Sequence, residues 1–303
     1  MSNNKSSWWG AGMMFTGAVL FSAKAIMVKV CYQYPVDAST LLALRMLFSF
    51  PFFLVVAIHS IWKRKKLGIE MESIAKTDWL KLILLGIVGY YLASIFDFEG
   101  LKYVTAGVER LILFIYPTLV VLMSAILYKR KIKKIEYYAL LLTYLGVSLV
   151  YWHDVSGKGD NVAFGALLVF LSAFTYAIYL VGSGHLIPKF GSVFYTACAM
   201  IVSTGATLLH HYFASSQSMW GLPSQVYIIV GFMAVFSTVI PGFLVSEAIK
   251  IIGASKSSII ASVGPVSTII LAYIFLNEGF TLFQFFGTVL VLAGVITVSI
   301  KKS

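Results

Sequence analysis

A gapless internal repeat constrains this chain more than any short motif does. The segment Glu99–Val150 aligns with Glu247–Val298 over 52 positions, and ten of these positions are identical. The identities include residue types that an apolar composition would not align by chance: Glu99/Glu247, Lys102/Lys250, Ala106/Ala254, Pro117/Pro265 and Gly146/Gly294. A repeat of this length predicts two copies of one unit, which we place at residues 1–155 and 156–303. Hydrophobic proteins with duplicated units are often secondary transporters, with the substrate pathway between the repeats.

The composition indicates a membrane protein. Of the 303 residues, 59% are apolar and only 12% are charged, whereas soluble domains carry roughly 25% charged residues. The net charge of +11 does not predict nucleic-acid binding, because the cations gather in short connections between apolar runs. Cys31 and Cys198 have no metal-site spacing and predict no disulfide. The expected partner is the lipid bilayer, and we interpret the N-terminal apolar run as a first span and not as a cleaved signal.

The apolar runs predict an all-α polytopic fold with ten transmembrane helices, because each run is long enough to cross roughly 30 Å of hydrocarbon as a helix. The first five spans are expected near residues 9–30, 39–59, 79–98, 103–128 and 135–152. The second five are expected near residues 162–181, 190–213, 225–246, 255–276 and 281–300.

The basic residues predict the orientation of these spans. The connections 60–78 and 129–134 each hold five cations, and with ten spans both lie on the same side as the two termini. The positive-inside rule makes that side cytoplasmic. Five spans per copy require the copies to face opposite ways, and the repeat-related loops agree: Lys129–Lys134 holds five cations, whereas Asn277–Leu282 holds none. We therefore expect an inverted repeat in the cell (inner or plasma) membrane, with both termini cytoplasmic.

Several stretches resemble the EamA branch of the drug/metabolite transporter superfamily. The residues that carry the resemblance are Leu20–Lys29, Leu44-Arg45, Gly100–Gly107, the prolines Pro117 and Pro265, and Asn277-Glu278. Two positions depart from the family pattern. Lys129-Arg130 stands where an acidic residue is frequent, and Lys24 stands where a neutral polar residue is more usual. The resemblance implies ten helices around a central cavity and movement of small organic solutes or drugs. Our own expectation is export of small organic metabolites (amino-acid-like or aromatic) or drugs.

Charged side chains within the spans are costly and predict functional positions. The candidates are Lys24, Arg45, Asp97, Glu109 and Arg110, with Glu99 at the rim, and all six fall in the predicted external half of the first copy. We predict that Lys24 faces the cavity and pairs with Asp97 or Glu109; the alternative is that its stem snorkels to the interface. Arg110 either forms a structural ion pair with these acids or handles substrate or protons. Arg45 can snorkel, and Glu99 and Glu247 have local partners at Lys102 and Lys250.

Tyrosines and prolines complete the candidate site. Tyrosine offers an apolar face and a hydroxyl group, so the predicted substrate pathway comprises Lys24, Tyr90, Asp97, Glu109, Arg110, Tyr116 and Tyr176. Tyr179 is a further candidate, and each tyrosine has packing as its alternative role. Pro117 and Pro265 are predicted to kink the fourth helix of each copy in mid-span and to act as hinges.

The sequence holds no signature of catalysis. The five histidines have no pair at the i, i+4 spacing of a metal-binding helix, and no phosphate-binding Gly-Lys-Ser/Thr loop occurs. We predict no enzyme activity, no cofactor and no metal. The leading hypothesis is a secondary carrier of small molecules, with protons as a candidate coupling ion. The alternatives are a passive facilitator of the same fold and an intramembrane enzyme that acts on lipid.

Overall fold

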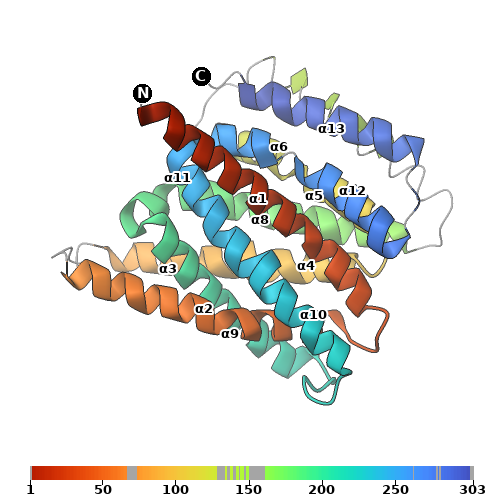
Figure 1. Cartoon of the computed structure of the whole chain (residues 1–303), viewed down its shortest axis with the longest axis horizontal. Helices are drawn as coiled ribbons and strands as arrows, with labels where there is room; N and C mark the ends of the chain where they lie inside the picture. Colours follow the sequence, from red (N-terminus) through yellow and green to blue (C-terminus); the bar gives the residue numbers. More distant parts are fainter. Residues whose placement is uncertain are drawn as a thin grey trace.

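The computed structural model describes residues 2–66, 74–127, 161–261, 263–277, 279 and 281–300, with 134, 137–138, 141–142, 144–146 and 148–149. Every regular element in these ranges is a helix (Figure 1). The first half contains α1 (Ser2–Cys31), α2 (Ala38–Lys66), α3 (Lys76–Gly86), η1 (Ile87–Leu92), α4 (Ala93–Gly100), α5 (Ala106–Leu113) and α6 (Tyr116–Leu127). The second half contains α8 (Val162–Phe190), α9 (Ser192–Ala214), α10 (Ser224–Ala234), η2 (Val235–Val239), α11 (Ile240–Ala261), α12 (Val263–Leu276) and α13 (Leu282–Ile300).

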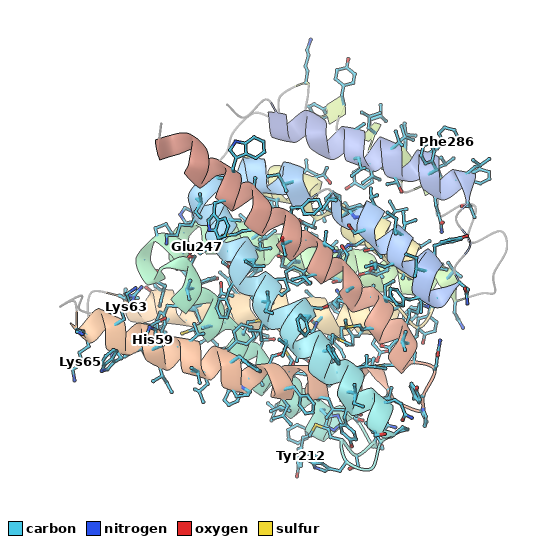
Figure 2. The ribbon with its side chains drawn as sticks, in the orientation of Figure 1. His59, Lys63, Lys65, Tyr212, Glu247 and Phe286 are labelled. Carbon is cyan, nitrogen blue, oxygen red and sulfur yellow. The ribbon has the colours of Figure 1, made fainter. Side chains whose placement is uncertain are left out.

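Six helical stretches in the described residues are long and apolar enough to cross a membrane. They are Trp8–Cys31, Ala38–Lys66, Lys76–Gly100, Val162–Phe190, Ser192–Ala214 and Ser224–Ile252. Val263–Leu276 and Leu282–Gly294 are shorter apolar helices. Large apolar side chains such as Phe286 point outward from the helices (Figure 2), where lipid would solvate them. The predicted span 135–152, most of the loop 129–134 and Glu278 lie outside the described residues.

The repeat extends further in the structure than in the sequence. α3 and α10 begin 148 residues apart and each has eleven residues. The π-helical segments η1 and η2 that follow them also begin 148 residues apart. Between residues 76–98 and 224–246 no aligned pair is identical, so only the backbone reveals this part of the duplication. π-helical turns frequently mark functional sites, and here both copies carry one in the same place.

The two copies run in opposite directions. α2 and α9 are the second helices of their copies, and they lie side by side (Figure 1). Near the start of α2, the Thr40 hydroxyl lies 3.3 Å from that of Ser215, which follows the end of α9. Near the end of α2, Arg64 donates a hydrogen bond to the carbonyl of Phe190, just before α9 begins. Counterpart helices that pack antiparallel confirm the inverted repeat.

The basic residues at the end of α2 mark one face of the bundle. Lys63 and Lys65 project from that end (Figure 2). Lys189, at the end of α8, forms a 2.6 Å ion pair with Asp78 at the start of α3. Three helix ends that the sequence places on one side of the membrane therefore meet at one face. Which side of the membrane this face occupies stays a prediction.

The prediction of a proline kink in mid-helix is wrong for Pro117. The expected span 103–128 is two helices, α5 and α6, separated by a turn at residues 114–115, and Pro117 is the second residue of α6. A proline in the first turn of a helix removes no intrahelical hydrogen bond. In the other copy, α11 ends at Ala261 and α12 begins at Val263, and position 262 lies outside the described residues. The kink at Pro265 and a hinge role for both prolines therefore stay predictions.

Candidate functional site

A cavity of about 160 Å³ lies between the two copies. One wall comes from α1, α2, η1, α4, α5 and the start of α6, and the other comes from α8, α9, η2 and α11. Six of the seven residues predicted for the substrate pathway line it: Lys24, Tyr90, Asp97, Arg110, Tyr116 and Tyr176. Glu109, the seventh, is fully buried and does not line the cavity.

Lys24 and Asp97 form a buried ion pair in the cavity wall. The Lys24 Nζ lies 2.5 Å from Oδ2 of Asp97, and the two side chains are 12% and 2% exposed. The same Nζ lies 3.8 Å from Oε1 of Glu109. These distances confirm the predicted pairing of Lys24. Its side chain contacts the two acids and does not snorkel to the interface. Buried charges require such partners, because desolvation of an isolated charge is very costly.

Glu109 lies behind the ion pair, in the first turn of α5. The Thr105 hydroxyl caps this helix by accepting a hydrogen bond from the backbone N–H of Val108 at 3.3 Å. A carboxylate in a first turn is favoured by the helix dipole. Neither carboxylate oxygen of Glu109 has a hydrogen-bond partner among the described residues. Lys24 therefore contacts both acids, and its contact with Asp97 is the closer one.

The two arginines of the cavity do not pair with acids in the described part of the chain. Arg45, which is 5% exposed, donates to the Ser94 hydroxyl at 2.9 Å and stacks over the Phe98 ring at 4.8 Å. Arg110 donates to the Ser22 hydroxyl at 3.0 Å. The structural ion pair considered for Arg110 is therefore absent from this arrangement, since its guanidinium points toward α1 instead. The Nε atoms of both arginines are buried, and no described residue accepts a hydrogen bond from them.

Tyrosine rings form the wall beside the charged groups. The rings of Tyr116 and Tyr176 meet edge to face at 5.3 Å. Tyr176 also stacks on Tyr179 at 6.0 Å, and the hydroxyl of Tyr179 donates to that of Tyr90 at 3.3 Å. This contact depends on Gly89, because a Cβ atom at that position would lie 2.1 Å from the Cβ of Tyr179. The small residue lets η1 approach α8 closely enough to seat Tyr90 in the wall.

Equivalent positions of the two copies face the same cavity but differ in chemistry. Tyr90, Ser94 and Asp97 line it from η1 and α4. Their counterparts 148 residues later, Thr238, Gly242 and Val245, line it from η2 and α11. Both copies therefore line the cavity with equivalent positions, and its described charged groups lie on the wall from the first copy.

Sequence reasoning left several cavity residues out of the predicted site. Arg45 was considered for a functional role and lines the cavity, as do Ser94 and Thr238. Ser94 could have been found because it lies one helical turn before Asp97 on the same face. Thr238 requires the repeat register, which shows no identity in that region. The helical pairs Glu99–Lys102 and Glu247–Lys250 are confirmed, at 2.8 and 2.9 Å, and neither residue pair lines the cavity.

Comparison with known proteins agrees with this architecture. Residues 8–152 and 163–300 each match the EamA-like transporter family. The chain belongs to that family. It is 30% identical to the uncharacterized transporter YcbK of Bacillus subtilis, covering 92% of this chain and 88% of that protein. It is 24% identical to the uncharacterized inner membrane transporter YicL of Salmonella typhimurium, covering 90% of both chains. A solved protein structure shares the fold over 95% of this chain, with a TM-score of 0.67 and 17% identity.

Membership of the EamA-like family confirms the predicted fold class. The protein is an all-helical, multi-pass membrane protein built from two EamA units. It is a membrane transporter and not an enzyme. The structure adds what membership alone does not give, namely which charged groups line the space between the units.

Proposed function

We propose that this protein is a secondary carrier of the cytoplasmic (inner) membrane that exports small organic solutes, amino-acid-like or aromatic metabolites or drugs, by alternating access. One observation carries the proposal. A buried, charged and tyrosine-lined cavity lies between two antiparallel copies of the same helical unit. In inverted-repeat carriers, substrate binds at this interface and each face opens in turn.

Different contacts hold the copies together at the two faces. At the basic face, the bonds are Arg64 to the Phe190 carbonyl and Lys189 to Asp78. At the opposite face, the Ser215 hydroxyl donates to Asp37 at 2.8 Å. Gln217 adds bonds from the same connection to the loop that precedes α2. Alternating access would break one set while the other persists.

The cavity residues along α1 give the proposed export pathway an apolar end and a charged end. They run from Met14 to Lys24, about 15 Å at 1.5 Å per residue. Met14 is nearer the N-terminal end, which the charge pattern predicts to be cytoplasmic, and Lys24 is nearer the other end. A solute that enters along the apolar part would meet the ion pair before it leaves on the far side.

Protons are the coupling ion that we propose. Lys24 contacts two buried carboxylates, and a proton taken up by Asp97 or Glu109 would release the ammonium group from one of them. Proton binding would therefore change which charges face the cavity. Because the equilibrium between two conformations follows differential binding, this exchange can couple a proton gradient to solute movement.

The test uses the purified protein in liposomes with a pool of small metabolites inside. We expect solutes to leave faster with the protein than without it, and to reach a higher external level when a pH gradient is imposed. Collapse of the gradient should leave equilibration and abolish accumulation. Equilibration that never responds to the gradient would establish the second candidate, a passive facilitator. If no solute crosses in protein-containing liposomes, the carrier proposal fails.

A further inference from the structure

The charged groups around the cavity do not balance. Three cations, Lys24, Arg45 and Arg110, line it, whereas only one described acid, Asp97, does so. With Glu109 behind Lys24 counted as ionised, the set still carries one net positive charge. A net charge within a membrane-spanning bundle is costly unless a counter-charge joins it. The missing partner is an anion.

The two guanidinium groups are the unsatisfied part of this set. Lys24 is occupied by Asp97 at 2.5 Å. Within the described residues, Arg45 and Arg110 each donate to a single serine hydroxyl, and their buried Nε atoms have no acceptor. Arginine carries five donors in a planar fork that fits a carboxylate or a phosphate group with two parallel bonds. Both guanidinium groups therefore have further N–H donors in the cavity wall that a ligand can accept from.

Both arginines are anchored close to the ion pair. Ser94, which holds Arg45, lies three residues before Asp97 on α4, and Ser22, which holds Arg110, lies two residues before Lys24 on α1. The serines fix the guanidinium groups without neutralising them. Such a hydroxyl anchor orients a cation and leaves its charge available, which a carboxylate partner would not do.

We propose that the cavity binds a small organic anion, with its acidic group held by Arg45 or Arg110 and its apolar or aromatic body against the tyrosine wall. This inference rests on the proposed function and narrows it to one substrate class. The rings of Tyr116 and Tyr176 present the apolar surface that such a body needs. A cationic solute would instead face three like charges.

The experiment compares three probes that share a phenylpropyl body: 3-phenylpropionate, its neutral amide, and 3-phenylpropylamine. Binding to the purified protein in detergent is measured by ligand-induced thermal stabilisation and by calorimetry. We expect the anion to bind at least about tenfold more tightly than the amide, the scale of one charge-assisted hydrogen bond. The amine should not bind. 3-Phenylpropylphosphonate separates carboxylate selectivity from general anion binding.

Variants assign the effect to the arginines. Arg45→Gln and Arg110→Gln should each be compared with the Arg→Lys change, and at least one glutamine variant should lose the tenfold preference for the anion. Lysine should restore part of it, because the charge returns without the fork. Lys102→Gln is the matched control, since Lys102 lies outside the cavity and pairs locally with Glu99.

The outcomes separate this inference from the proposed function. Equal binding of the amide and the anion, binding of the amine alone, or no binding of any probe overturns the anion site, even if liposomes still transport other solutes. A glutamine variant that melts earlier but keeps the full preference shows that its arginine is structural. Failure of all transport in liposomes, with the anion preference intact, counts against the carrier and not against the site.

Discussion

Replacement of Lys24 by methionine removes the described cation that lies within 4 Å of both Asp97 and Glu109. At an effective dielectric constant of about 20, a pair of charges 2.5 Å apart interacts by roughly 6–7 kcal/mol, and a pair 3.8 Å apart by roughly 4 kcal/mol. Desolvation offsets part of this attraction, and loss of one partner from a buried pair costs about 3–5 kcal/mol. We therefore expect Lys24→Met to abolish transport and to lower the melting temperature in detergent, although its expression should not fall.

Loss of transport in Lys24→Met alone would not separate a functional charge from a structural one. The double variant Lys24→Met/Asp97→Asn removes both members of the closer pair and leaves no uncompensated charge at that contact. We expect it to regain most of the lost stability and to remain inactive in the liposome assay. Lys24→Arg should keep part of the activity, because a cation still faces Asp97.

The control for these variants is Lys102→Met, which removes a lysine from an exposed i, i+3 pair with Glu99. Exposed pairs contribute about 0–1 kcal/mol, so this variant should melt and transport like the wild-type protein. The reasoning is refuted if the double variant transports at the wild-type rate. In that case, the Lys24–Asp97 pair only holds α1 against α4, and the charged end of the cavity has no part in the transport cycle.

Three further predictions concern the prolines, one connection and the topology. Pro117→Ala and Pro265→Ala should slow transport several-fold in liposomes with the melting temperature unchanged, because alanine returns a backbone N–H donor and, at position 117, permits the helix to continue through the turn at residues 114–115; wild-type rates would make the prolines packing features. Burial raises the pKa of Asp37, but hydrogen bonds from the Thr40 backbone and the Ser215 hydroxyl outweigh it, so this pKa is lowered overall. A carboxyl whose pKa is lowered by folding stabilises the folded protein above the usual pKa near 4, and this contribution is lost as the pH falls through the lowered pKa of the folded state. Asp37→Ala should therefore cost about 1 kcal/mol at neutral pH, as loss of a helix cap does. The melting curves of the variant and the wild-type protein should converge in acid. Cysteines at Lys133 and Glu278, in a background without the native cysteines, should react with an impermeant thiol reagent from the cytoplasmic and external sides, respectively; external labelling at position 133 would reverse the predicted orientation.

The features that could be predicted from the sequence are those that follow directly from the type and spacing of the residues. Apolar runs predicted the spans, and the repeated segment predicted two opposed copies. The cost of charge in lipid predicted that Lys24 pairs with Asp97 or Glu109, and the closer partner is Asp97, 73 residues away in the sequence. Each of these predictions needs only composition, spacing and the energetics of the membrane, and none needs the direction of a side chain.

The remaining features depend on geometry that spacing does not encode. Arg110 neighbours Glu109 in the sequence, yet successive side chains of a helix point about 100° apart, and its guanidinium contacts Ser22. The helix break at residues 114–115 falls before Pro117 because a proline fits the first turn of a helix better than its interior. The π-helical segments depend on how the backbone packs against neighbouring helices. The need for glycine at position 89 becomes apparent only in the structure, where Tyr179 packs against it.

The duplication places equivalent backbone positions on both walls of the cavity. The sequence differences between the copies determine which side chains each wall presents. Asp97 corresponds to Val245, and both residues line the cavity, so one position is an acid on one wall and apolar on the other. In the same register, Glu109 and Arg110 correspond to two serines. A carrier whose two faces open in turn by exchanging equivalent contacts would treat both walls alike if their residues were alike. Because the described charged groups that line the cavity belong to the first copy, a cycle that exchanged equivalent contacts would place them differently in its two conformations, and the proposed anion or proton would then bind the two with different affinities.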